Sequence, residues 1–332
     1  MNVTRGVGIG LLIAFGSIAV AAPLLTPYDP GRSFADYPYA PPMRPHVVAN
    51  DGWHAPFVYP LHLVDRLERR YQEDRTVRMP LRWCHAGTLV RVDDGPSPWF
   101  LLGSDALGRD VLSRLALGAR LSLGVSAAAA ILTLLIGAAI GAGAAVLRGL
   151  ADDLLMRTAD LVIVLPTIYV VLALRSALPL VLSSIQVAIA MVAVLGLVGW
   201  PTVARGVRTI VSTEASQEYA EAARAAGASR WRILRRHLLP ATRGFVLAQA
   251  GVLLPTFVLA EATLSFVGLG FPAPAPSWGA MLQDAASVRA LLDAPWLLAP
   301  AFAIVATVLA VHLAITAPTE QEAGTGFRLV SH

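Results

Sequence analysis

Six long runs of apolar residues constrain this 332-residue chain more than any other feature of its sequence. The runs cover residues 7–23, 121–147, 161–178, 181–203, 245–267 and 296–317. A transmembrane helix needs about 20 mostly apolar residues, and the runs are close to or above that length. A mean hydropathy of +0.62 with only 14% charged residues agrees with a bilayer as the solvent. The sequence therefore predicts an all-α integral membrane protein with six transmembrane helices.

The charged residues and the cysteine content exclude several classes of protein. All 26 basic residues are Arg and the formal net charge is only +4, which excludes a Lys-rich tail or a nucleic-acid-binding patch. Cys84 is the only cysteine, so an intrachain disulfide and a thiolate metal cluster are both excluded. The charges must be interpreted by their position along the chain.

The first apolar run has two interpretations. It follows Arg5 and ends in small residues, as a cleaved signal peptide does. The Pro-Tyr-Asp-Pro sequence at 27–30 is more typical of the exit from a helix. We therefore interpret residues 1–26 as an uncleaved N-terminal transmembrane anchor helix.

Residues 27–103 contain no long apolar run and are rich in proline, aromatic and charged residues, which predicts an insert outside the membrane. Leu61, Val64, Leu67 and Tyr71 have helical spacing, whereas residues 82–92 are typical of a short strand pair. The prediction is a mixed insert between helices 1 and 2. Its histidines have spacings that fit no compact set of metal ligands, so we interpret them as structural or surface residues: His46, His54, His62 and His85.

The placement of Arg predicts the orientation in the membrane. The loop at 204–243 holds eight Arg against three Glu, and cytoplasmic loops carry the excess of positive charge. Counting spans from this loop places both termini in the cytoplasm, with a tail at 318–332, and places the insert outside. The Arg residues of the insert do not contradict this, because long translocated segments escape the rule. The membrane core then covers residues 104–317 and contains five of the spans.

Proline and glycine mark special positions inside the spans. Pro166 and Pro255 predict kinks, which membrane helices tolerate because neighbouring groups satisfy the freed carbonyls. Gly137 and Gly141 form a small-xxx-small face that predicts close helix packing.

The loop at 204–243 contains a local pattern of its own. The alanines between residues 220 and 226 favour helix, Gly227 permits a left-handed turn, and Ser229 can cap a second helix. Pro240 marks the boundary before the next span. Two short helices that project from the membrane suit docking into a groove of a partner protein. A solvated loop whose Arg residues meet anionic lipid is the alternative, and the residues alone do not decide between them.

Four stretches resemble a known family. Glu221-Ala222-Ala223, Gly227 and the His237-Leu-Leu-Pro sequence at 237–240 resemble the EAA loop of binding-protein-dependent ABC importer permeases, with His where the usual pattern has Ile. Residues 102–114, 199–205, and 261–270 with 276–280 resemble the C-type permease subunit of the dipeptide, oligopeptide and nickel importer family.

The resemblance implies a function and a set of partners. It implies a permease subunit of an ATP-driven importer in the bacterial inner membrane, which forms the pathway for dipeptides or oligopeptides with a second, B-type permease. Two cytoplasmic ABC ATPase subunits and an extracytoplasmic solute-binding protein complete the assembly. Nickel chelates or another small solute are the alternative cargo. The implied ATPase-coupling residues are Glu218, Glu221, Ala222, Ala223, Gly227, Arg230, Leu239 and Pro240.

The chain is not expected to be an enzyme. A P-loop needs a lysine, and the sequence has none, so ATP and Mg²⁺ would bind to partner subunits. We expect no cofactor, catalytic residue or metal in this chain. A membrane-anchored enzyme that uses the insert, or a scaffold, are the rival hypotheses, and the insert offers no recognisable pair of nucleophile and base.

Isolated charges in or beside the spans leave two roles open. Glu261 lies in the fifth span, where it either lines the solute pathway or makes a buried hydrogen bond. Asp105, Arg109, Asp110 and Arg114 precede the second span in a predicted interfacial helix. We favour pairing of Arg109 with Asp105 at the i, i+4 spacing over contact with a binding protein.

Overall fold

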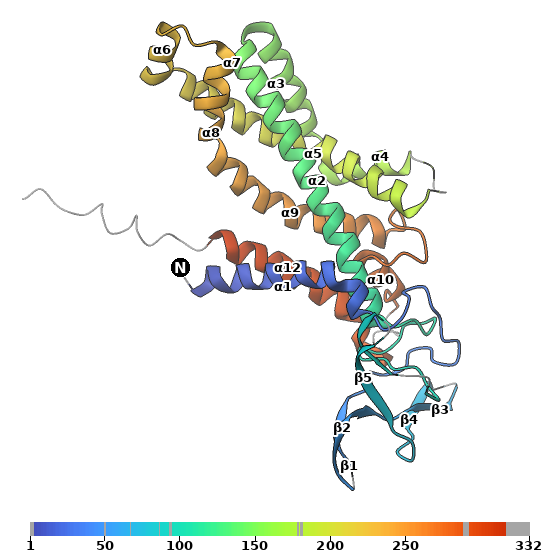
Figure 1. The fold of residues 1–332 in the computed structure, drawn as a ribbon. Helices are drawn as coiled ribbons and strands as arrows, with labels where there is room; N and C mark the ends of the chain where they lie inside the picture. The colour runs from blue at the N-terminus through green and yellow to red at the C-terminus, as the bar shows by residue number, and fades with distance from the viewer. Residues whose placement is uncertain are drawn as a thin grey trace, which may run out of the picture.

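A computed structural model describes residues 3–49, 51–66, 68–85, 87–92, 95–177, 179, 182–287 and 292–316 of the chain. Long helices form most of it, and a strand-rich insert lies at one end of them (Figure 1). The predicted cytoplasmic tail, residues 318–332, lies outside the described residues.

Five long helices form the membrane part. They are α1 (Val3–Leu25), α2 (Val111–Leu147), α5 (Ser184–Ala215), α9 (Arg243–Phe266) and α12 (Ala299–Thr316). Each is long and apolar enough to cross a bilayer, α12 together with the short 3₁₀ turn before it. The multi-pass helical architecture that the sequence predicted is therefore confirmed.

The remaining predicted span is bent. It consists of α3 (Gly149–Val164) and α4 (Thr167–Ser176), which meet at an angle of 91°. Leu165 has the extended backbone that a following proline imposes, so the helix breaks at Pro166. Pro255, by contrast, lies inside α9, which continues past it. The described helices thus give five spans, or six if the bent pair counts as one.

The insert is built from strands. β1 (His46–Ala49), β2 (Gly52–Val58), β5 (Met79–His85) and β6 (Thr88–Val92) form an antiparallel sheet in the order β1-β2-β5-β6. The predicted strand pair is confirmed, because β5 pairs with β6.

The predicted helix at residues 61–71 is wrong. β3 (Leu61–Asp65) and β4 (Arg70–Glu73) pair as an antiparallel hairpin instead. Leu61 is buried and Val64 is exposed, so these two apolar residues do not share the face that a helix would need.

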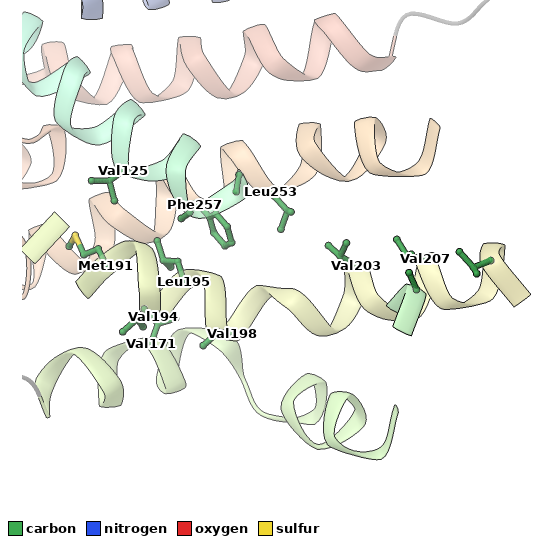
Figure 2. Packing of buried hydrophobic residues seen from close by; sticks show 14 of the residues in the cluster. Val125, Val171, Met191, Val194, Leu195, Val198, Val203, Val207, Leu253 and Phe257 are labelled. Carbon is green, nitrogen blue, oxygen red and sulfur yellow. The ribbon is translucent and has the colours of Figure 1, made fainter. Parts of the chain in front are cut away.

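Glycine allows α2 and α5 to pack closely. A Cβ atom at Gly141 would overlap the carbonyl oxygen of Ala204, and one at Gly137 would lie 2.9 Å from the carbonyl oxygen of Trp200. The close packing predicted from this small-residue face is confirmed. Figure 2 shows the adjoining core, in which Val125, Leu195 and Phe257 of three different helices pack together.

The start of α2 differs from its prediction. Residues 104–110 form a turn closed by an antiparallel bridge between Ser104 and Asp110, and α2 begins at Val111. The interfacial helix predicted to contain Asp105 and Arg109 is therefore wrong, although the pairing is observed, with Arg109 Nε 2.7 Å from Asp105 Oδ2.

Four side chains form an ion-pair network at this turn, which we call the insert-side charge cluster: the buried Asp105, Arg109 and Arg114 and the exposed Asp284. Arg114 also contacts Asp105, and both Arg side chains donate to Asp284 Oδ2, over 2.8 and 2.9 Å. Asp284 ends α10 (Trp278–Asp284), a short helix far along the chain. The cluster therefore joins the turn before α2 to the segment that follows α9.

Candidate functional site

The segment at 204–243 begins as a helix. α5 continues to Ala215, so the first part of the predicted loop is helical, because no further proline follows Pro201 before the polar sequence at 213–217. α6 (Glu218–Ala225) and α7 (Arg230–Ile233) follow, then a π-helical turn (Leu234–Leu238) and α8 (Leu239–Ala241). The prediction of two short helices on either side of Gly227 agrees with this structure. We call residues 218–241 the hairpin.

Gly227 makes the turn between α6 and α7. Its φ is +80°, and an added Cβ would meet nothing within 4 Å, so conformation rather than space requires glycine here. The amide of Ala228 donates to Ala223 O and that of Gly227 to Arg224 O, both over 3.0 Å. This is the Schellman pattern of a helix end. The Ser229 hydroxyl accepts from the Arg232 amide and caps α7, as predicted.

One face of the hairpin is attached to the membrane core. Ala220, Ile233, Leu234 and Leu238 are buried in the same apolar cluster as Val207 of α5. The attachment is also polar, because the Arg224 side chain donates to the carbonyl oxygens of Ala220 and Ala215. A displacement of the hairpin must therefore move α5 or break these contacts.

The opposite face is presented to solvent. Of the residues predicted to couple to an ATPase, five are exposed: Glu218, Glu221, Ala222, Gly227 and Arg230. The other three are half-buried: Ala223, Leu239 and Pro240. Leu239 and Pro240 lie in α8, at the base of the hairpin, so the structure separates them from the exposed set.

Two aromatic residues of this face were not identified from the sequence. Trp231 is 67% exposed, and Tyr219 is 42% exposed with its hydroxyl 2.6 Å from Glu214 Oε2. This hydrogen bond raises the pKa of the Tyr219 hydroxyl. Large aromatic side chains are frequent in protein interfaces, and a tryptophan among Ala and Arg was the available signal.

A basic cavity of about 310 Å³ lies between the hairpin and the ends of α2 and α5. Arg148, Arg224 and Arg230 contribute to its wall, and Val211 and Leu238 are among its apolar residues. The surface around the hairpin thus combines guanidinium groups with apolar side chains, which favours a partner surface that carries carboxylates.

Glu261 lies away from the hairpin, in the interior of the helical membrane part. Its side chain is fully buried in α9, and Ser265 Oγ donates to Glu261 Oε1 over 2.7 Å. The adjoining Ser122 hydroxyl accepts from the Trp278 amide over 3.1 Å, so this polar group links α2, α9 and α10. The buried hydrogen bond is present in the single chain, and a role in lining a pathway stays a prediction.

Three of the four insert histidines lie beside other side chains or rings, and the side chain of His85 lies outside what the structure describes. His54 Nε2 lies 2.9 Å from Asp51 Oδ1, His62 Nε2 lies 3.4 Å from Asp74 Oδ2, and the His46 ring stacks on Phe57. Within the described ranges, His, Cys, Asp and Glu form no group of three or more that could hold a metal ion.

Comparison with known proteins gives a consistent set of relatives. A family profile described as binding-protein-dependent transport system inner membrane component matches residues 135–317. The oligopeptide transport system permease protein OppC of Bacillus subtilis (strain 168) is 38% identical over 208 residues, which are 63% of this chain and 66% of OppC. The di/tripeptide transport system permease protein DppC of Pseudomonas aeruginosa (strain UCBPP-PA14) is 31% identical over 305 residues, 91% of this chain and 81% of that protein.

A solved structure of the MetNI methionine ABC transporter in inward-facing conformations is a more distant match. It has a TM-score of 0.43 and 19% identity, and it covers 59% of this chain and 95% of the matched chain. A similarity of this size is too small to define a common fold.

Proposed function

The chain belongs to the family of binding-protein-dependent transport system inner membrane components, and from this premise we propose that it is a permease subunit of an ATP-driven importer of dipeptides or oligopeptides. With a second, B-type permease it forms the solute pathway, and it catalyses no reaction itself. The observation that carries the proposal is the hairpin, which is attached to α5 on one face and exposed on the other.

The hairpin is proposed to act as the coupling element. Its exposed residues, among them Glu221 and Ala222, enter a groove of a cytoplasmic ATPase subunit, and small side chains allow close approach. Ala220 and Leu238 pack against the membrane core, so movement of the ATPase is passed to α5 rather than lost in a free loop. Such a mechanism is a rigid-body movement between two states that a distant ligand biases.

The orientation follows from the same proposal. The hairpin and the insert lie at opposite ends of the structure (Figure 1), which agrees with an ATPase at one end and a solute-binding protein at the other. Both termini are then cytoplasmic and the insert is extracytoplasmic. ATP and Mg²⁺ bind to the ATPase subunits, since a chain without lysine cannot form a P-loop.

The peptide cargo is supported by the relatives. OppC of Bacillus subtilis is named for oligopeptide transport, and DppC of Pseudomonas aeruginosa is named for di- and tripeptide transport. In a binding-protein-dependent system the binding protein makes the first selection, so a peptide bound by the cognate binding protein is the cargo to test.

The test uses the complete complex in proteoliposomes, with binding-protein-stimulated ATP hydrolysis and peptide uptake as the two measurements. Gly227→Arg is expected to lower both by about tenfold, the effect of 1.4 kcal/mol, because the side chain obstructs the docked face. Gly227→Ala reports the cost of the left-handed backbone alone, which is roughly 1–2 kcal/mol.

Gly52→Arg is the matched control. Gly52 also has a positive φ, and an added Cβ there meets nothing within 4 Å, but it lies in the insert. The proposal predicts that this variant keeps hydrolysis coupled to uptake. If Gly227→Arg assembles with the ATPases and both rates stay at the wild-type level, the hairpin does not couple.

A further inference from the structure

An apolar cavity of about 400 Å³ lies where the insert meets the ends of three membrane helices. Its wall includes Phe15 and Leu25 of α1, Leu112 of α2, Ala303 of α12 and Leu89 of β6. Leu25 ends α1 and Leu112 begins α2, whereas Phe15 lies in the middle of α1, so the cavity extends from the insert along the membrane helices. The coupling mechanism makes no use of it.

A second, basic cavity of about 180 Å³ lies farther along β6. Leu89 and Val90 line the apolar cavity, and the next two residues of the strand, Arg91 and Val92, line the basic one. The segment after α1 also contributes to both cavities: Pro27 lines the apolar cavity and Tyr28 lines the basic one. The two cavities are therefore neighbours that share the same two segments of backbone.

The basic cavity has a fixed aromatic wall. The Tyr28 hydroxyl accepts from the Trp99 amide over 2.8 Å. The guanidinium carbon of Arg32 lies 4.8 Å from the ring centre of Phe34 and 5.8 Å from that of Tyr28. The nearby Asp29 carboxylate accepts from the Gly31 amide over 2.8 Å. Arg32 is thus held over rings rather than in an ion pair with Asp29.

The combination matches an amphiphilic anion. An acyl chain gains little free energy by leaving the bilayer for an apolar cavity, since lipid tails are as apolar as the side chains they would meet. Selectivity must then come from the head group, and phosphate is the group that paired guanidiniums recognise best. A soluble anion would leave the apolar cavity unfilled, and a neutral lipid would leave the two guanidiniums without a counter-charge.

We propose that this corner binds one phospholipid from the leaflet on the insert side, with an acyl chain in the apolar cavity and its phosphate between Arg32 and Arg91. The proposed lipid site requires only that the helices lie in a membrane. It can therefore be tested independently of the proposed peptide transport. The lipid would fill the angle between α1 and the insert and hold β6 against the membrane.

The test is native mass spectrometry of the assembled transporter, extracted in mild detergent and titrated with phosphatidylglycerol. Wild-type complex is expected to retain one lipid per copy of this chain. A Lys or Arg near a membrane surface is worth about 1 kcal/mol, or roughly a fivefold change in affinity, so Arg32→Gln with Arg91→Gln should weaken binding by about 25-fold. Arg66→Gln is the matched control, because Arg66 is 84% exposed in the insert and contacts Asp36 at 3.8 Å.

Two further measurements separate the parts of the site. Diacylglycerol, which has no phosphate, should bind the wild-type complex no more tightly than phosphatidylglycerol binds the double variant. Inorganic phosphate at millimolar concentration should not compete with phosphatidylglycerol. Ala303→Leu narrows the apolar cavity and leaves the two Arg residues unchanged. It should weaken the binding of phosphatidylglycerol. Equal lipid retention by wild type and the double variant, displacement by free phosphate, or a wild-type complex without bound lipid would each overturn the proposal. Arg32→Gln alone, at an exposed position, gives the same comparison if the double variant does not fold.

Discussion

Charged side chains are buried and paired near the start of α2, whereas those of the hairpin, near its other end, are exposed. In the insert-side charge cluster the side chains of Asp105 and Arg114 are each only 4% exposed and pair with each other. In the hairpin Glu221 and Arg230 are exposed, and neither forms an ion pair within the part of the chain that the structure describes. The first set is paired within the chain and links the turn before α2 to α10. The second is available for a surface that another polypeptide supplies.

The largest expected effect is on the buried set. Asp105→Asn removes the carboxylate that both Arg109 and Arg114 contact, and breaking a buried ion pair costs about 3–5 kcal/mol. The free energy of unfolding of the detergent-solubilised protein should fall by that amount. Asp36→Asn is the control, because Asp36 and Arg66 are both more than 80% exposed, and the expected cost is below about 1 kcal/mol. Equal losses in the two variants would contradict the contrast between buried and exposed charges.

A smaller effect is expected at Asp110, which caps α2 by accepting from the Ser113 amide over 2.8 Å. Asp110→Ala loses the cap, which costs about 1 kcal/mol, whereas Asp110→Asn keeps an acceptor and should cost little. Burial raises the pKa of the Asp110 carboxyl to about 6. The ordinary value is about 3.9, so between these values the folded state binds more protons than the unfolded state. Its contribution to stability therefore falls as the pH rises from about 4 to about 6.

Thermal unfolding of wild type and Asp110→Asn at pH 4.5 and pH 7.5 measures this contribution. Relative to wild type, Asp110→Asn should be more stable at pH 7.5 than at pH 4.5, because the Asn side chain has no charge to bury. Other carboxyls, such as Asp74, have a lowered pKa and act in the opposite direction, but they are common to both proteins and cancel in the difference. A difference that does not change with pH would show that Asp110 is not desolvated.

The smallest expected effect on stability is at the exposed set. Glu221→Gln should change the free energy of unfolding by less than about 0.5 kcal/mol, as surface substitutions do. In the complete transporter the same variant should lower binding-protein-stimulated ATP hydrolysis by roughly tenfold, because in the proposed complex it would remove a charge-assisted hydrogen bond to the ATPase. Glu68→Gln in the insert, where Glu68 is exposed and pairs with Arg70, serves as the control. A destabilised fold with intact hydrolysis would reverse the assignment of the hairpin.

Local signals made the membrane part and the hairpin predictable. The length of an apolar run is set by the thickness of the bilayer, so the apolar helices could be located before any packing was known. The turn at Gly227 and the cap at Ser229 depend only on neighbouring backbone groups, which the sequence specifies directly. The approach of α2 to α5 followed from small residues on one helix face.

Long-range contacts were not predictable in the same way. The i, i+4 pair of Arg109 and Asp105 was readable, but Asp284 joins it from 175 residues away, and only the fold brings them together. In the insert, Leu61, Val64 and Tyr71 have helical spacing, but they lie in the paired strands β3 and β4. The conformation of such a short segment depends on the packing around it. The sequence of the segment alone does not specify that packing.

The length of α2 has a mechanical consequence. Its 37 residues run unbroken from the insert to the corner before α3. At 1.5 Å per residue this is a rod of about 55 Å, nearly twice the thickness of the hydrocarbon layer. The glycine contacts with α5 lie in the last third of the rod, at Gly137 and Gly141, so a pivot there has arms of about 42 Å on the insert side and about 12 Å toward α3. A tilt of about 10° would move the insert-side tip through about 7 Å and the other tip through about 2 Å in the opposite direction, so a small displacement near α3 becomes a larger one beside the insert.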